Sequence, residues 1–355
     1  MTNERRDSME EVTIKDIARL CGVGVSTVSR AINNHPDINT ETKEMILSTI
    51  QQYGYVPNNS ARNLKKSDTK SVAVLVKGIT NPFFSNMIKI IEEESKKKNY
   101  SMYLQHVEAE QDEVDVAQKL IKEKRLRGII FLGGLFSHSE EKVNKLTVPY
   151  VFSTAGSVPE KCDKQFYSSI GVDDRKESSR MVEYLLNLGH KKIAILVAEP
   201  EEESIGLLRL EGYKDALQKH GVPVDEGLII NADCDPEHFS LKNGYLTAKK
   251  LLDSKKEFTA VYAVSDTIAI GACRALQEAG LRIPEDVSVA GYDGIDQANY
   301  MTPSLTTMKQ PVEEMAKVTI KLLFDIIAGK KEHQHIRYDA QIIENESTGK
   351  PKKIC

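Results

Sequence analysis

The chain has 355 residues and a net charge of −4 at pH 7, and 40% of its residues are hydrophobic. This length exceeds one ordinary domain and suits a small head with a two-lobed body, and the hydrophobic content suffices for real cores. No apolar run reaches membrane-spanning length, the polar N-terminus is no signal peptide, and the five scattered cysteines offer neither a disulfide framework nor a zinc site. We therefore expect a cytoplasmic protein without a metal.

The first predicted element is a helix that begins near Thr13. Thr13 and Asp16 have the spacing of a capping box, and apolar residues at helical spacing follow them. Gly22 and Gly24 end this helix, and a second helix is predicted from about 25 to 33. The two glycines make the connection between the helices a tight turn.

The second predicted helix carries a polar face. Four polar residues lie at i, i+3, i+4 and i+7, namely Ser26, Ser29, Arg30 and Asn33. Two short helices joined by a tight glycine turn describe a helix-turn-helix, whose second helix can lie in the major groove of DNA. Arg, Ser and Asn side chains match the donors and acceptors of the base edges there.

A third predicted helix, with Asn39 as its N-cap and Gly54 at its end, closes this unit. Residues 12–70 carry eight Lys and Arg and five Asp and Glu, a net charge of +3, while the rest of the chain is acidic. A small basic head on an acidic body is compatible with DNA binding.

Four patterns resemble the lac repressor (LacI/GalR) family in their order and spacing, and these are VTIKDIA, TVSR, GYVPN and AR-x-L-K. The resemblance implies an N-terminal all-α helix-turn-helix head at 12–57, a hinge helix at 58–70 and a two-lobed periplasmic-binding-protein-like body at 71–346. The DNA-contacting residues predicted for the head and hinge are Thr13, Val25, Ser26, Thr27, Ser29, Arg30, Asn33, Asn39, Tyr55, Asn58, Ala61, Arg62 and Leu64.

The hinge candidate at 58–66 is short and polar, and a helix of about nine residues is not stable alone in water. Its residues alone suggest a flexible linker. The family resemblance implies instead that the segment folds on operator DNA, pairs with its dimer mate and inserts Leu64 into the minor groove. Unstacking a base step costs a few kcal/mol, which the contacts of a bent duplex offset.

From Ser71 onward, apolar runs of four to six residues alternate with amphipathic stretches. Strands that alternate with helices imply an α/β body with parallel sheets covered by helices, and two such series suggest two similar lobes. We place 71–172 and 307–331 in the first lobe and 173–306 and 332–346 in the second. Ligands of such sheets bind at the carboxyl ends of strands, here in the cleft between the lobes.

Residues that follow the predicted strands are the candidates for this cleft. Asn81, Phe83 and Phe84 follow the first strand, where aromatic rings can stack on a sugar or a base, although we expect one ring to be core. Arg209 and Asp293 match ligand-binding residues of the family, with a surface salt bridge as the alternative for Arg209. The remaining effector-binding candidates are Thr154, Asp174, Phe239, Asp266 and Gln310, with helix capping as the alternative for Asp174 and Asp266.

The first hypothesis is a transcription regulator, expected to be a repressor, in which a homodimer binds a near-palindromic operator in double-stranded DNA. A small-molecule effector, a sugar or sugar derivative, would bind the cleft and shift lobe closure. One alternative is a response to a phosphorylated carrier protein, and another is an enzyme or transport binding protein of the same fold. No nucleophile–base constellation or phosphate loop appears, so we expect neither an enzyme nor a cofactor. The C-terminal tail lacks a heptad repeat, which favours a dimer.

Overall fold

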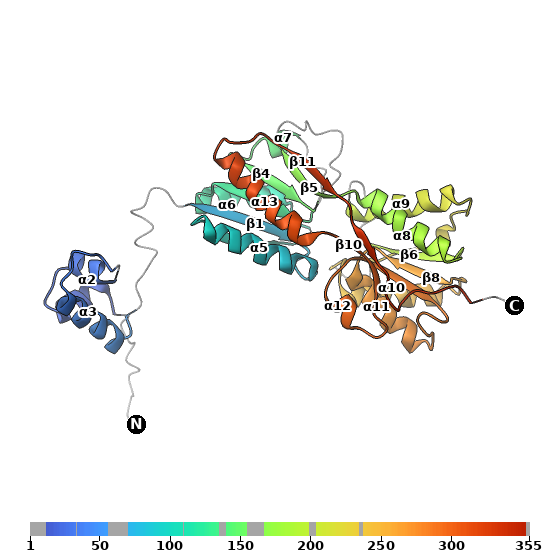
Figure 1. Cartoon of the computed structure of the whole chain (residues 1–355), viewed down its shortest axis with the longest axis horizontal. Helices are drawn as coiled ribbons and strands as arrows, with labels where there is room; N and C mark the ends of the chain where they lie inside the picture. Colours follow the sequence, from blue (N-terminus) through green and yellow to red (C-terminus); the bar gives the residue numbers. More distant parts are fainter. Residues whose placement is uncertain are drawn as a thin grey trace, which may run out of the picture. The chain divides into compact units, whose positions relative to one another are not determined.

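The computed structural model describes residues 12–32, 34–55, 70–108, 110–134, 140–154, 167–198, 204–233 and 237–352. The chain divides into two units, Met1–Asp68 and Thr69–Cys355, which we call the head and the body (Figure 1). Each unit has its own buried core.

The head contains three helices, α1 (Ile14–Leu20), α2 (Val25–Ile32) and α3 (Thr40–Gln52). The backbone N–H of Thr13 donates to Oδ2 of Asp16 at 3.0 Å, as the predicted capping box requires. Gly22 has φ of +65°, in the left-handed region that favours glycine, and it turns the chain from α1 toward α2. Each helix contributes one fully buried aliphatic side chain, and these are Ile17, Val28 and Ile46. The predicted helix-turn-helix fold is confirmed.

Five of the predicted DNA-contacting residues lie outside the described residues. They are Asn33, Asn58, Ala61, Arg62 and Leu64. The hinge helix at 58–70 therefore stays a prediction from the family resemblance.

The first lobe of the body is built on a parallel six-stranded sheet in the order β11-β5-β4-β3-β1-β2. Residues of β1 alternate between the two faces, because Val74 belongs to the same buried cluster as Met87 of α5, whereas Leu75 belongs to the cluster of Val114 of α6. The strands are β1 (Ser71–Lys77), β2 (Ser101–Val107), β3 (Gly128–Leu132), β4 (Tyr150–Ser153), β5 (Ser168–Val172) and β11 (His335–Tyr338). The helices are α5 (Phe83–Lys97), α6 (Glu113–Lys124), α7 (Glu140–Val143) and α13 (Val312–Ile327).

The second lobe has a six-stranded sheet in the order β12-β10-β9-β8-β6-β7, in which only β12 is antiparallel to its neighbour among the described strands. Its strands are β6 (Ile193–Val197), β7 (Ile229–Asn231), β8 (Ala260–Ala263), β9 (Ser288–Asp293), β10 (Thr306–Lys309) and β12 (Gln341–Ile343). Its helices are α8 (Asp174–Asn187), α9 (Ile205–Lys219), the 3-10 helix η1 (Glu226–Leu228), α10 (Leu241–Asp253), α11 (Asp266–Glu278) and α12 (Gln297–Tyr300).

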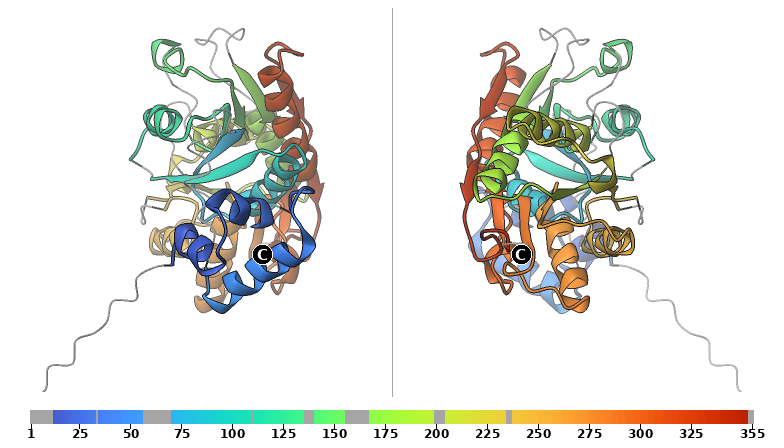
Figure 2. Two further views of the ribbon diagram at one scale, coloured as in Figure 1. Left: turned by 90° about the vertical axis from the view of Figure 1, so that its left-hand side faces the viewer. Right: turned by 90° about the vertical axis from the view of Figure 1, so that its right-hand side faces the viewer.

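Two boundaries between the lobes differ from the predicted ones. Strand β10 belongs to the second sheet, although we placed the chain from 307 onward in the first lobe. Strand β11 pairs with β5 in the first sheet, although we placed 332–346 entirely in the second lobe. Figures 1 and 2 show the red C-terminal segment passing from one sheet to the other. Hydrophobic periodicity identifies a short strand but does not say which sheet it joins, because pairing depends on distant neighbours.

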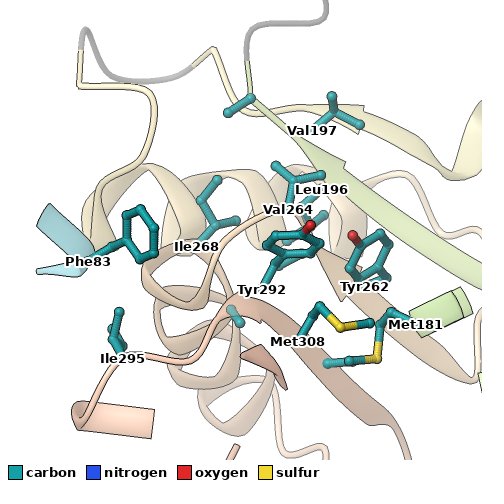
Figure 3. Close-up of a cluster of buried hydrophobic side chains, with 14 of the residues drawn as sticks. Phe83, Met181, Leu196, Val197, Tyr262, Val264, Ile268, Tyr292, Ile295 and Met308 are labelled. Carbon is teal, nitrogen blue, oxygen red and sulfur yellow. The ribbon is translucent and has the colours of Figure 1, made fainter. Parts of the chain in front are cut away.

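One buried apolar cluster extends across both lobes of the body. Figure 3 shows Phe83, at the start of α5 in the first lobe, beside Ile268 and Ile295 of the second lobe. These three side chains are at most 7% exposed. The carboxyl ends of the two sheets are therefore held close together. In the described part of the chain, no helix combines the length and the apolar character that a membrane span needs.

Candidate functional site

A cavity of about 160 Å³ lies between the carboxyl ends of the two sheets. Both lobes contribute to its wall, as the predicted cleft requires. Seven of the ten predicted effector-binding residues line it, and these are Asn81, Phe83, Phe84, Thr154, Arg209, Phe239 and Asp293, together with Gln310 as the eighth. Only Asp174 and Asp266 of that set do not.

Asp293, the last residue of β9, is the point where the two lobes meet. Its carboxylate accepts hydrogen bonds from Nδ2 of Asn81 in the first lobe at 3.1 Å and from Nε2 of Gln310 at 3.0 Å. Gln310 lies where the chain crosses from β10 to α13. Burial raises the pKa of Asp293 to about 6, and the charge of Arg209 opposes that rise. A buried carboxylate thus joins three segments at the cavity wall.

Asp293 also has a strained backbone, with φ of +120°, and Thr154 has φ of +71°. Both residues line the cavity, and positive φ is rare for residues other than glycine, especially for a β-branched one such as Thr. Oγ1 of Thr154 accepts a hydrogen bond from the backbone N–H of Gly133 at 3.1 Å, which fixes the loop after β4. Strained residues of this kind concentrate at functional sites because the surrounding structure must hold them in place.

Arg209 on α9 supplies the buried positive charge of the site. It is 4% exposed, which makes the alternative of a surface salt bridge wrong. Its Nε donates to Oδ1 of Asp174 at 2.9 Å, its Nη1 donates to the carbonyl oxygen of Val264 at 2.5 Å, and Nη1 lies 3.6 Å from Oδ1 of Asp293. The guanidinium therefore sits between two carboxylates, with one edge toward the cavity.

Asp174 lies behind Arg209 and does not reach the cavity, which corrects its assignment as a ligand contact. Burial raises the pKa of Asp174 and the charge of Arg209 lowers it. The N-cap of α8 is the preceding residue, Asp173, whose side chain accepts from the N–H of Lys176. Asp174 thus orients Arg209, because a buried guanidinium needs a fixed partner.

Asp266 also lies behind the wall of the cavity and is fully buried, which is a second correction. Its Oδ2 accepts from the backbone N–H groups of Gly294 at 2.7 Å and Ile295 at 2.9 Å, and its Oδ1 accepts from Oγ1 of Thr307 at 2.6 Å. The N-cap of α11 is Ser265. Asp266 therefore holds the loop that follows Asp293, and it could not be distinguished from a ligand contact by its place after a strand.

Both predicted aromatic residues after β1 are buried, and both also line the cavity. The rings of Phe83 and Phe84 meet edge to face with centroids 5.3 Å apart. Phe239 lines the cavity from the second lobe, and its carbonyl oxygen accepts from Oγ1 of Thr267 at 2.8 Å. The expectation that one Phe would be only core is not met, because burial and access to the cavity coincide here.

Several charged residues that the sequence analysis did not select also line the cavity. Lys77 ends β1, donates to the carbonyl oxygen of Gln111 at 3.2 Å and lies 3.8 Å from the buried carboxylate of Glu113. Its position at the carboxyl end of a predicted strand was an available signal. The others are His106, Glu108, Glu110, Glu237 and His238.

The head presents part of its predicted DNA-contacting set at its surface. Val25 is 42% exposed at the start of α2, and Ser26 and Arg30 are exposed on the same helix. The side chain of Asn39 instead accepts from the N–H of Glu41 at 2.8 Å, so it caps α3 as its spacing predicts. Thr13 is exposed, and Thr27, Ser29 and Tyr55 are half-buried.

Comparison with known proteins places both units. Residues 13–58 match the model described as bacterial regulatory proteins, lacI family, and residues 182–348 match a periplasmic binding protein-like domain. The chain is 40% identical over 338 residues to the HTH-type transcriptional regulator MalR of Clostridium butyricum, which covers 95% of this chain and 99% of that protein.

Two solved structures are similar over the body or more. A complex of the transcriptional regulator CelR with cellobiose has a TM-score of 0.69 and 27% identity, covering 95% of this chain and 99% of that one. A LacI family regulator from Enterococcus faecium with bound ribose has a TM-score of 0.68 and 32% identity, covering 80% of this chain and 100% of that one. The chain therefore belongs to the lacI family of bacterial regulatory proteins, which are DNA-binding transcription regulators rather than enzymes.

Proposed function

We propose that the protein is a cytoplasmic repressor that binds a near-palindromic operator as a homodimer and releases or grips it when a sugar binds the cleft. The observation that carries the effector part is the shared carboxylate of Asp293, which Asn81, Gln310 and Arg209 approach from different segments. A carboxylate, two amides and a guanidinium offer fixed acceptors and donors to a ligand rich in hydroxyl groups. Phe rings beside them suit the apolar faces of a sugar.

The charges of the cavity favour an uncharged sugar over a phosphorylated one. Four carboxylates line it, from Glu108, Glu110, Glu237 and Asp293, against the two cations Lys77 and Arg209. Each cation already faces a buried carboxylate behind the wall. An added phosphate would meet a negative field without a free cation, which is costly in a partly dry site. The cellobiose and ribose bound to the two similar regulators agree with an uncharged sugar.

The contact between Asn81 and Asp293 supplies the coupling. It joins the two lobes directly, so a ligand that bridges the same groups stabilises one lobe arrangement over the other. A change in operator affinity follows only if the two arrangements present the heads differently, and the effect must be reciprocal between DNA and sugar.

The DNA part of the proposal is supported by the exposed face of α2. Val25 offers an apolar surface to a thymine methyl group, and Ser26 and Arg30 offer hydrogen bonds to base edges. The net charge of +3 over 12–70 adds phosphate attraction, so operator affinity should fall as salt rises.

The test has two arms on the full-length protein. Selection from a random DNA library would identify the operator, and its binding would then be measured with and without each member of a panel of neutral sugars, sugar phosphates, nucleobases and amino acids. A ligand at about 100 times its dissociation constant stabilises the body by roughly 2.7 kcal/mol, which a thermal shift detects. A neutral sugar that shifts both melting and operator affinity is the expected result. An operator affinity that changes only with a phosphorylated carrier protein would overturn the effector assignment.

A further inference from the structure

The cavity has a floor that crosses four adjacent strands of the first lobe. Lys77 of β1 pairs with Val107 of β2, Val76 of β1 pairs with Leu132 of β3, and Leu132 pairs with Ser153 of β4. The residues at the carboxyl ends therefore form one row, which runs Thr154, Gly133, Lys77, Val107, and all four line the cavity.

This row gives the cavity a length. The strand order β4-β3-β1-β2 contains three intervals, and neighbouring strands lie roughly 4.8 Å apart, so the row spans about 14 Å. A single sugar ring is much shorter than this row, whereas two linked rings match it.

The two ends of the cavity can be told apart by the connections between the lobes. The described crossovers follow β5, β10 and β11, which lie toward one edge of each sheet, and we call this the hinge side. Asp293 and Gln310, at the ends of β9 and β10, belong to the hinge side. Strands β2 and β7 form the opposite edges of the two sheets, and we call this the open side.

The open side has polar groups of its own. His106 and Glu108 lie at the end of β2, where Nδ1 of His106 is 3.4 Å from Oε1 of Glu108. Glu237 and His238 follow β7 in the second lobe. Lys77 stands between the two ends of the floor, held by Glu113 and the carbonyl oxygen of Gln111. Donors and acceptors therefore extend along the whole row rather than around the Asp293 end alone.

We infer that the cavity takes a neutral saccharide of two linked rings, with one ring at Asp293, Arg209, Asn81 and Gln310 and the second at His106 and Glu108. This inference rests on the proposed sugar-binding function and adds the size of the ligand and the residues that select it. His106 and Glu108 are assigned as specificity-determining residues, because a monosaccharide held at the Asp293 end would not reach them.

The experiment is isothermal titration of the full-length protein with maltose, cellobiose, lactose, sucrose, trehalose and melibiose, and with glucose, galactose, fructose and ribose. At least one disaccharide should bind tenfold or more tightly than either of its constituent monosaccharides. A monosaccharide that binds as tightly as every disaccharide would overturn the two-ring assignment and leave the sugar-binding function standing. Binding of none of these sugars would overturn the proposed effector class, and the two-ring assignment with it.

Two variants then test the assigned residues. His106→Ala and Glu108→Ala should each weaken the disaccharide by tenfold or more and change the affinity for its monosaccharide by less than twofold. Glu123→Ala, at an exposed position of α6, is the matched control and should change neither. An equal loss for both sugars would assign the pair a structural role, and no loss for either would remove it from the site. Thermal melting of each variant without sugar verifies that the body remains folded.

Discussion

The guanidinium carbon of Arg209 lies 3.7 Å from the ring centre of Tyr292. Tyr292 is fully buried in β9, directly before Asp293, and Figure 3 shows its ring beside that of Tyr262. Burial raises the pKa of both tyrosine hydroxyls, so the rings stay neutral next to the cation. The flat contact fixes the plane of the guanidinium, and the plane sets which edge faces the cavity.

Replacing Arg209 by Lys should therefore weaken effector binding tenfold or more while operator binding without effector stays unchanged. Lys keeps the positive charge near Asp174 but loses the flat contact with Tyr292 and the fork of donors. Titration calorimetry with the effector and fluorescence anisotropy with operator DNA measure the two affinities. The control is Arg274→Lys on α11, where the side chain is 71% exposed. Unchanged effector affinity in Arg209→Lys would remove the guanidinium from the recognition of the ligand.

Asn81→Asp should open the body. The new carboxylate would face Asp293 at the place of a 3.1 Å hydrogen bond, and two like charges at that distance repel each other strongly in a buried site. The radius of gyration from small-angle X-ray scattering, measured without effector at pH 8, should exceed that of the wild type. Asn99→Asp changes the same residue type at an exposed position after α5 and should leave the radius unchanged. Identical radii for Asn81→Asp and wild type would mean that this contact does not hold the lobes.

In the head, Asn39→Ala should destabilise α3 by about 1 kcal/mol, because the N–H of Glu41 loses its acceptor. Backbone amides of α3 should then exchange with deuterium roughly fivefold faster in the full-length protein, if they exchange through unfolding of the head. Gln51→Ala, near the exposed end of the same helix, should leave the exchange rates unaltered. Protection equal to wild type in Asn39→Ala would mean that this cap contributes little.

The head could be predicted almost entirely from sequence because its determinants are local. The capping box of Thr13 and Asp16 and the cap at Asn39 connect residues within three positions of each other, and the structure contains both. Helical spacing likewise identified the buried Ile17 and Val28.

The cavity could be predicted only in part. Asp266 and Asp293 both follow apolar strands, and only contacts 28 to 41 residues away along the chain separate their roles. The open side was missed because the run YSMYL predicts a strand at 100–104, whereas β2 is Ser101–Val107. β2 is an edge strand whose exposed and polar residues, Gln105 and His106 among them, interrupt the apolar pattern before its true end.

The carboxyl group of Asp266 should make the stability of the body depend on pH. Burial raises its pKa to about 8, and the nearby charge of Asp293 adds to that rise, whereas the ordinary value is 3.8. Between these two pH values the folded state binds a proton that the unfolded chain has released. The free energy of unfolding therefore falls as pH rises, by up to about 1.4 kcal/mol per pH unit, and the contribution is fully present only below the lower value.

Asp266→Asn should flatten this dependence, because the amide resembles the protonated carboxyl and has no proton to release. The amide oxygen can still accept from Gly294 and Ile295, and the amide nitrogen can donate to Thr307. Urea unfolding of the body at pH 5, 7 and 9 measures the slope, with Asp296→Asn at an exposed position as the control that should keep the wild-type slope. If wild type and Asp266→Asn lose stability in parallel between pH 5 and 9, then Asp266 is ionised in the folded state throughout and its three hydrogen bonds outweigh its burial.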